Sequence, residues 1–479
     1  MNPQHHLPPP PMSRRDFLAR QAGGIGAIAL SQLLGGSAFG ASKTAGSPFA
    51  PRTPHLAPRA KNVIFMFMAG GPSHLDLLDP KPQMRKWDGQ PPPKGMVDAK
   101  ATIAGAVMAS PREFTRFGKS GLEFSDLLPH TGAIADELCV VRSLHTDSSN
   151  HDPAQLLFNC GTQLFGHPSL GSWVNYGLGS LSQDMPGYVV LNSGKDVEAR
   201  AALMGNGFLP STYSGVTVRT SDDPILFLKN PPGISQAAQR ARLDALRDLN
   251  QFHLKSTGDA EIASRIESYE MAFRMQAAAP GLLDLTHETA ATRELYGLDQ
   301  EPTRAFGTNC LLARRLVEHG VRFVQLFDSS WDDHNELDKQ LKTNCLRTDQ
   351  PAAALVRDLK QRGLLEDTLV IWAGEFGRTP MAENHFDVSG PKPGGAGRDH
   401  HPHAFSIWMA GGGVKPGHVH GMTDDFGYHV VEDGVHIHDL HATILHLLGL
   451  NHEQLTHRHV GRDFRLTDVA GKVVKGILA

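Results

Sequence analysis

One stretch decides the fold: residues 62–68 read NVIFMFM and are followed by the loop sequence AGGP at residues 69–72. A strand whose consecutive residues are apolar is buried on both faces, and such strands are typical of parallel sheets that helices cover on both sides. The sequence therefore predicts a central strand here that ends in a tight loop.

Similar apolar runs recur along the chain, and stretches with helical periodicity separate them. The runs begin at Cys139 (CVVRSL), Tyr188 (YVVL), Arg322 (RFVQLFD), Thr368 (TLVIWAGEFG) and Phe405 (FSIWMAGGG). Residues 303–320 and 351–363 have the amphipathic pattern of helices and end at glycine. This alternation predicts an α/β fold with a doubly wound, mostly parallel sheet flanked by helices.

Residues 235–298 interrupt the alternation. They are polar, rich in Arg, Glu, Ala and Gln, and helical in period, so we expect a helical insertion. Two interpretations remain open: a lid over the active-site face, or a solvated helical hairpin packed at the edge of the sheet.

The N-terminus differs from the rest of the chain. SRRDFL at residues 13–18, with the pair Arg14 and Arg15, precedes a weakly apolar run at residues 23–34. The stretch resembles a twin-arginine signal peptide, although a basic tail that holds two arginines is the simpler alternative. We expect a signal peptide at residues 1–40, a linker at 41–60 and one domain at 61–479.

Export by the twin-arginine translocase would place the protein in the periplasm or at the cell surface, with no transmembrane segment after processing. The charge composition bears on other partners. The chain has 46 Lys and Arg residues and 50 Asp and Glu residues, and its basic residues do not form a stripe along the sequence. The composition therefore argues against a nucleic-acid partner.

Carboxylates and imidazoles follow several of the predicted strands. In an open α/β sheet, ligands bind beyond the carboxyl ends of the strands, so these side chains are expected to meet at one edge. Such groups suit a divalent metal, either Zn, Ca, Mg or Mn. The candidate metal ligands are Asp76, Asp332, Asp333, His334, Glu375, His400, His401 and His403.

The order of these motifs resembles that of alkaline phosphatases, sulfatases and cofactor-independent phosphoglycerate mutases. The mature chain resembles more closely an exported family within that superfamily, domain of unknown function 1501. The motifs that carry this resemblance are SRRDFL, GGPSHLDLLDPKP, NHDPAQLLFNCGT, WDDHNEL, WAGEFGRTP and the tail from DLHATILHLLGL. The resemblance implies a metal-dependent hydrolase of phosphate or sulfate esters, with anionic polysaccharides as one class of substrate.

The sequence departs from the superfamily pattern at the nucleophile. His151 occupies the position of the sulfatase formylglycine, so His151 itself is a candidate nucleophile, and Ser149 or Ser148 takes that role if the helix begins differently. A metal-ligand role for His151 is the alternative. Arg378 and Lys81 are the candidate groups for binding the anionic ester. A second hypothesis is a catalytically inactive scaffold that binds a metal, a glycan or a partner protein.

Overall fold

The structure is a computed structural model. It describes residues 47–96, 105–193, 200–219, 225, 230, 233–383 and 395–479. All of these except residue 47 belong to the unit Pro48–Ala479. The predicted signal peptide, with Arg14 and Arg15, lies outside the described residues. Among the described helices, none is long and apolar enough to cross a bilayer.

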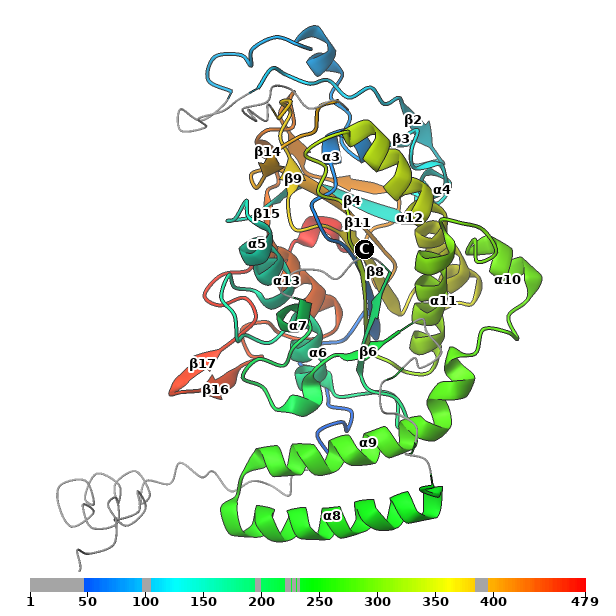
Figure 1. The fold of residues 1–479 in the computed structure, drawn as a ribbon. Coiled ribbons are helices and arrows are strands. Elements are labelled where there is room, and N and C mark those ends of the chain that lie inside the picture. Colours follow the sequence, from blue (N-terminus) through cyan, green and yellow to red (C-terminus); the bar gives the residue numbers. More distant parts are fainter. Residues whose placement is uncertain are drawn as a thin grey trace, which may run out of the picture. The chain divides into compact units, whose positions relative to one another are not determined.

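The described part of the chain builds a nine-stranded central sheet (Figure 1). The strand order is β12 (His418–His420), β4 (Leu138–His145), β11 (Phe405–Ala410), β8 (Thr368–Ala373), β1 (Asn62–Met68), β7 (Phe323–Asp328), β5 (Tyr188–Asn192) and β6 (Val216–Val218), and β15 (Val435–His436) also pairs with β4. Strand β11 runs antiparallel to both neighbours, while the other pairs in this sheet are parallel. The sheet is therefore mixed and mostly parallel, which confirms the predicted α/β class.

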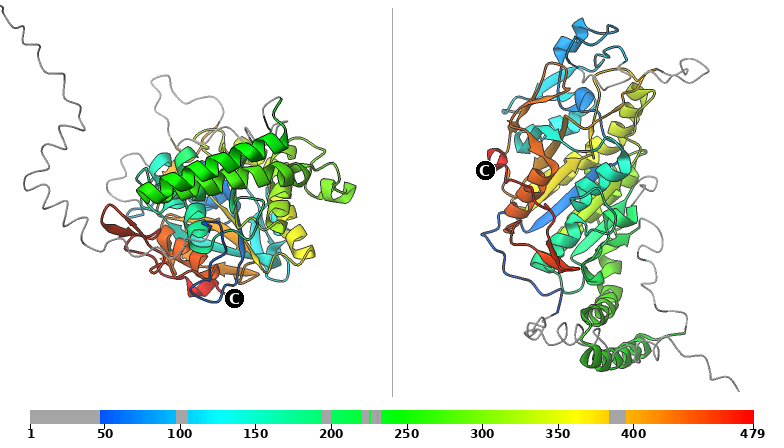
Figure 2. Two further views of the ribbon diagram at one scale, coloured as in Figure 1. Left: turned by 90° about the horizontal axis from the view of Figure 1, so that it is seen from below. Right: turned by 90° about the vertical axis from the view of Figure 1, so that its left-hand side faces the viewer.

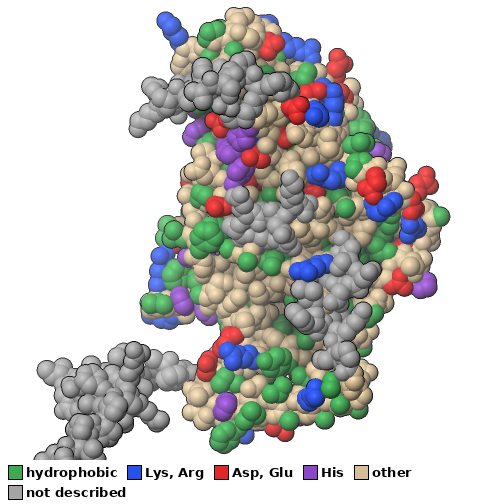
Figure 3. Space-filling view, viewed as in Figure 1, with side chains coloured by type: hydrophobic (Ala, Val, Ile, Leu, Met, Phe, Trp, Pro, Cys, Tyr) green, Lys and Arg blue, Asp and Glu red, His purple; other side chains and the backbone are tan. Residues whose placement is uncertain are grey.

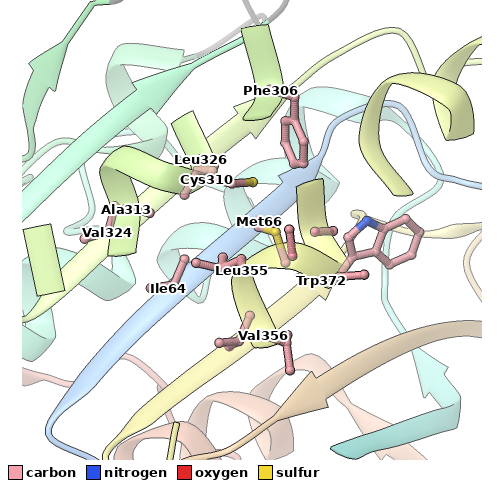
Figure 4. Close-up of a cluster of buried hydrophobic side chains, with 14 of the residues drawn as sticks. Ile64, Met66, Phe306, Cys310, Ala313, Val324, Leu326, Leu355, Val356 and Trp372 are labelled. Carbon is pink, nitrogen blue, oxygen red and sulfur yellow. The ribbon is translucent and has the colours of Figure 1, made fainter. Parts of the chain in front are cut away.

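Strand β1 lies between β7 and β8, and every one of its residues is buried. On one face, α11 (Arg304–Glu318) and α12 (Leu337–Gln361) cover the sheet. Figure 4 shows Ile64 and Met66 of β1 packed with Cys310 of α11 and Leu355 of α12.

Helices of the opposite face are α5 (His151–Cys160), α6 (Leu170–Leu178) and α13 (Ile437–Leu447). Phe65 of β1 stacks on Phe158 of α5 with ring centroids 5.7 Å apart, and Trp173 and Ile444 join the same buried cluster. The two views in Figure 2 show helices on both sides of the sheet. Apolar side chains on both faces explain why β1 is continuously apolar in sequence.

Helix α12 begins earlier than its sequence pattern predicted. The expected start was residue 351, because proline is common in the first turn of a helix. In the structure the helix starts at Leu337 and contains Pro351 in its interior. Leu337, Leu341 and Cys345 are buried at four-residue intervals before the proline, and Leu355 and Leu359 are buried after it. The apolar stripe therefore continues through the proline.

The predicted insertion contains α8 (Gln236–Thr257), α9 (Ala260–Leu283) and α10 (Ala290–Leu295). Helices α8 and α9 form an antiparallel hairpin, and α9 contacts η3 (Ser211–Tyr213), which precedes the edge strand β6. In Figure 1 this hairpin lies away from α5 and β9 (Gly377–Arg378). The arrangement favours a hairpin at the sheet edge over a lid.

Shorter elements complete the described chain. They are α3 (His74–Leu77), η1 (Pro82–Lys86), β2 (Phe114–Phe117), β3 (Leu122–Ser125), α4 (Pro129–Gly132), η2 (Ala135–Glu137), α7 (Arg200–Leu203), β10 (His400–His401), β13 (Met422–Thr423), β14 (Val430–Glu432), β16 (His457–His459), β17 (Arg462–Phe464) and η4 (Lys475–Ile477).

Candidate metal centre

Three segments that are distant in sequence bring four side chains together. His151 is the first residue of α5, Asp332 and His334 follow β7, and His400 lies in β10, which pairs with β9 after β8. Figure 3 shows histidine side chains gathered over the region that Figure 1 labels β9 and β15. The ligand atoms of these four residues all lie within 4.8 Å of one another.

The Asp332 carboxylate is at the middle of this group. Its Oδ1 lies 2.8 Å from Nε2 of His334 and 3.0 Å from Nε2 of His400. Its Oδ2 lies 3.2 Å from Nε2 of His151, and the Nε2 atoms of His334 and His400 are 2.9 Å apart. One carboxylate and three imidazole nitrogens thus converge.

The Nδ1 atom of each imidazole, which faces away from Asp332, donates a hydrogen bond that fixes the orientation of the ring. The acceptors of the Nδ1–H groups are the Glu375 carboxylate for His151 (2.8 Å), the carbonyl oxygen of Ser149 for His400 (2.6 Å) and the Glu383 carboxylate for His334. A neutral imidazole that donates from Nδ1 has a lone pair on Nε2. All three lone pairs therefore point toward Asp332.

Lone pairs and a carboxylate this close repel one another unless a cation or added protons lie between them. Zinc bound tetrahedrally at about 2.0–2.1 Å would hold neighbouring ligand atoms roughly 3.3 Å apart. The distances from the Asp332 oxygens to the three imidazole nitrogens, 2.8–3.2 Å, are close to that value, and the ligand atoms of all four residues lie within 4.8 Å of one another. The four residues therefore fit a divalent metal, and a set rich in imidazole suits zinc better than calcium or magnesium.

The pKa values of the side chains in this group also show that it requires positive charge. Burial opposes protonation of His151, yet Asp332 and Glu375 raise the pKa of its imidazole to about 9. Asp332 also raises the pKa of His334. Burial opposes ionisation of Asp332 itself, but hydrogen bonds from the histidines hold its pKa far below the ordinary value. Without a metal, protons on His151 and His334 thus balance the carboxylates, whereas burial lowers the pKa of His400.

Glu375 supports the group without joining it. Its side chain is fully buried, and Oε1 accepts hydrogen bonds from His151, from Nε2 of Gln155 (2.9 Å) and from the backbone N–H of Gly70 (3.0 Å). Gly70 has a φ of +124°, and a Cβ there would lie 2.5 Å from the backbone nitrogen of Asp332. The AGGP loop thus needs glycine for its conformation and for its close approach to Asp332.

Arg378 has a different position from the one predicted. Its side chain is buried, and its guanidinium donates to the carbonyl oxygens of Gly71 (2.8 Å) and Arg398 (3.0 Å) and to Oδ1 of Asp332 (2.6 Å). These contacts orient the Asp332 loop and leave the guanidinium poorly placed to bind an ester. These contacts favour a positioning role for Arg378, and its catalytic and substrate-binding roles stay predictions.

Asp76 requires a correction, because it does not join the four-residue group. Its carboxylate is buried and accepts hydrogen bonds from Nε of Arg398 (2.9 Å), Nη2 of Arg398 (3.3 Å) and the Ser73 hydroxyl. Burial disfavours its charge, but Arg398 outweighs this effect and lowers the pKa of Asp76. An arginine therefore takes the place that a metal was expected to take.

Three other predicted ligands also lie outside the group. His401 is buried and donates from Nε2 to the carbonyl oxygen of Tyr428 (2.6 Å), while the His403 side chain is exposed. Asp333 is buried, and burial raises the pKa of its carboxyl to about 7, with Asp332 adding to the rise. The sequence pattern correctly predicted the edge of the sheet at which these residues lie. It did not predict that their side chains stay outside the four-residue group.

Lys81 is also corrected as a substrate-binding residue of this site. Its ammonium lies 3.0 Å from Oδ1 of Asp79. The Lys81 side chain lines a separate cavity, and no residue of the four-residue group lines that cavity.

Sequence reasoning missed Glu383, which belongs with His334 and Asp399 to a second candidate metal-binding group. Glu383 lies in a loop five positions after Arg378, outside any motif that follows a strand directly. The sequence offered no signal for its role beyond the abundance of acidic residues near the histidines.

Three solved structures are among those similar to this chain. The lipoteichoic acid synthase LtaP from Listeria monocytogenes is 10% identical, with 89% of this chain and 79% of that chain covered and a TM-score of 0.34. The PsFucS1 sulfatase from Pseudoalteromonas sp. is 15% identical, with 82% and 69% covered and a TM-score of 0.34. The alkaline phosphatase from the Antarctic bacterium TAB5 is 10% identical, with 83% and 99% covered and a TM-score of 0.31.

These likenesses are too distant to indicate an activity. No curated protein matches the sequence. The family described as "Protein of unknown function (DUF1501)" matches residues 60–478, which is most of the chain. The chain therefore belongs to this family.

Proposed function

We propose that the protein is an exported, metal-dependent hydrolase of phosphate or sulfate esters, with anionic polysaccharides among its substrates. The observation that carries the proposal is the convergence of three imidazole Nε2 atoms on Asp332, each imidazole being fixed by an acceptor at Nδ1. A bound divalent metal would supply Lewis acidity toward an ester oxygen and lower the pKa of a water molecule or hydroxyl.

The chain's own residues have separable roles in this proposal. Arg378 fixes the Asp332 carboxylate, and Glu375 and Glu383 fix two of the imidazoles. Ser149 is exposed and lies two residues before His151, and its carbonyl oxygen accepts a hydrogen bond from His400. We assign the attack on the ester to Ser149, because His151 uses both of its nitrogens within the group.

Export is part of the same proposal. The twin-arginine translocase carries folded proteins, so a metal could be bound before the protein reaches the periplasm or cell surface. The SRRDFL stretch supports this route.

A test uses the purified full chain with zinc or manganese, assayed on p-nitrophenyl phosphate and on an aryl sulfate. We expect turnover that Asp332→Asn lowers by at least about 100-fold, because the variant removes the central carboxylate. Asp367→Asn, whose carboxylate pairs with Lys61 on the surface, is the matched control. Equal turnover in Asp332→Asn and wild type would contradict the proposal.

Ser149→Ala separates the two routes of attack. Loss of turnover supports attack by the Ser149 hydroxyl, whereas full turnover assigns the attack to water. Ser148→Ala is its neighbour control, since the Ser148 hydroxyl contacts the carbonyl oxygen of Asn150 at 3.4 Å.

One observation favours the second candidate, a non-hydrolytic binding scaffold. The buried Phe376 ring lies 4.5 Å from the His400 ring and 5.1 Å from the His151 ring, measured between centroids. This aromatic cover narrows access to two of the imidazoles. A protein that binds metal stoichiometrically but turns over neither ester would support this candidate.

A further inference from the structure

A second polar cavity lies apart from the candidate metal centre. It has a volume of about 740 Å³ and is bounded by the loop after α3, by β4 and by the segment from β12 to β14. This volume falls within the range of small-molecule sites, roughly 300–1,000 Å³. His151, Asp332, His334 and His400, all described by the structure, do not line it.

Two basic side chains lie beside one buried carboxylate in the lining of this cavity, which also includes Glu123, Asp424 and Lys415. Lys81 and Arg142 have side chains only 10% and 16% exposed, and they share one buried carboxylate, Asp79. The Asp79 Oδ1 atom lies 3.0 Å from the Lys81 ammonium and 3.8 Å from Nε of Arg142. Its Oδ2 already accepts a hydrogen bond from the Thr423 hydroxyl. Two cations therefore face one anion.

Arg142 has donors that the described residues do not use. Its Nε donates to the carbonyl oxygen of Leu78 at 2.9 Å, but neither Nη1 nor Nη2 makes a hydrogen bond with any described residue. Both Nη groups are absent from the buried side-chain atoms of the described residues that lack a partner, so they are open to the cavity, and the planar guanidinium matches two oxygens of a carboxylate, sulfate or phosphate. The inner wall is therefore suited to an anionic group.

The mouth of the cavity has the opposite charge. Asp425, Glu432 and Asp433 line it and are exposed. Several negative charges on one ligand would be repelled at this mouth, whereas hydroxyl or ammonium groups would be accepted. The two ends of the cavity thus select different groups on one molecule.

We propose that this cavity binds a small hydrophilic molecule through a single anionic group, which contacts Arg142 and Lys81, while hydroxyl or amino groups of the same molecule face the acidic mouth. The site is separate from the proposed hydrolase centre, and its occupancy does not depend on that activity.

The test is isothermal titration calorimetry of the full chain with inorganic phosphate, sulfate and O-phosphoethanolamine. Each titration is run with metal-loaded and with chelator-treated protein, so that an anion at the metal centre is distinguished from one in the cavity. We expect one molecule bound per chain after chelation, with O-phosphoethanolamine the tightest of the three because its ammonium faces the acidic mouth. Any additional binding that appears only in the metal-loaded protein belongs to the metal centre.

Arg142→Gln should weaken this binding by about tenfold or more, as expected for loss of a charge-assisted hydrogen-bond pair. Lys61→Gln, at a cation 60% exposed outside the cavity, should leave it unchanged. If Arg142→Gln does not fold, Lys81→Gln replaces it, with the same expectation. Absence of binding, binding that chelation abolishes, or binding that the cavity variant leaves intact would each overturn the proposal.

Discussion

At the scale of the residue, the orientation of each imidazole is set by an acceptor outside the four-residue group. Glu375 is fully buried and held by Gly70 and Gln155, so it can fix His151 without moving. Glu383 has the same relation to His334. Acceptors of this kind fix the tautomer and increase the basicity of the ligating nitrogen.

Replacing Glu383 by Gln should therefore weaken metal binding without removing a ligand. The expected loss is about 10–100-fold in affinity, because the amide is a weaker acceptor and no longer favours the tautomer with its lone pair on Nε2. Competition with a chromogenic chelator measures the affinity, and Glu336→Gln in the nearby loop is the control. Unchanged affinity in Glu383→Gln would show that the carboxylate does not orient His334.

The sequence identified part of this site for a physical reason. Asp332, His334 and His400 follow strands or lie near a strand end, and the carboxyl ends of parallel strands meet at one edge. Asp76 satisfies the same pattern but is neutralised by Arg398. Only the three-dimensional pairing decides whether a carboxylate meets an arginine or an imidazole, and the sequence carries no record of that pairing.

At the scale of the element, helix α13 carries a buried histidine that has no part in the metal centre. His441 is fully buried, and its Nε2 donates to the carbonyl oxygen of Phe158 on α5 at 2.7 Å. Burial lowers the pKa of His441 to about 3. The neutral imidazole thus links two helices on the same face of the sheet.

This shift makes the stability of the protein sensitive to acid. The unfolded chain protonates His441 near pH 6.5, whereas the folded chain resists protonation until about pH 3. The stabilising contribution of neutral His441 to the free energy of unfolding is fully present above pH 6.5. As the pH falls from 6.5 to about 3, the free energy of unfolding decreases by about 1.4 kcal/mol per pH unit. His441→Gln keeps a donor for Phe158 and cannot titrate, so it should reduce the acid-dependent slope by about that amount.

Urea unfolding at a series of pH values between about 6.5 and 4 measures the slope. His446→Gln on the same helix, at a side chain that is not buried, is the control and should keep the slope of the wild type. Parallel slopes in His441→Gln and wild type would contradict the assignment of a buried neutral imidazole.

Elements differ in how well the sequence predicted them. The apolar runs became β1, β4, β5, β7, β8 and β11, because burial on both faces leaves a continuous signal. The start of α12 was placed too late, since a proline inside a helix has the same local signature as one at its start. Packing of Leu337 and Leu341 decided the boundary instead.

At the scale of the whole molecule, helices cover both faces of one sheet and the candidate centre occupies one edge. The α8–α9 hairpin packs near the edge strand β6 and away from β9, so the centre is not covered by it (Figure 1). The sequence predicted these helices but left their position open, because a polar helical stretch carries no information about which surface it contacts.

Export through the twin-arginine pathway is predicted from Arg14 and Arg15, which lie outside the described residues. Changing both Arg14 and Arg15 to Lys should leave the protein inside the cell, because the twin-arginine pair is the feature that the translocase reads. Arg20→Lys, just after the pair, is the control. Cell fractionation with immunodetection gives the result, and export of the double variant at the wild-type level would contradict the assignment.

The most direct test of the central claim is elemental analysis combined with X-ray absorption spectroscopy of the purified full-length protein. We expect one divalent transition metal per chain at the four-residue group, bound mostly by imidazole nitrogens at roughly 2.0–2.1 Å if the metal is zinc. We also expect that His334→Ala loses this metal while His403→Ala, at an exposed histidine outside the group, retains it. A protein that takes up no metal, or one whose metal remains bound in His334→Ala, would show that these four residues do not form a metal centre.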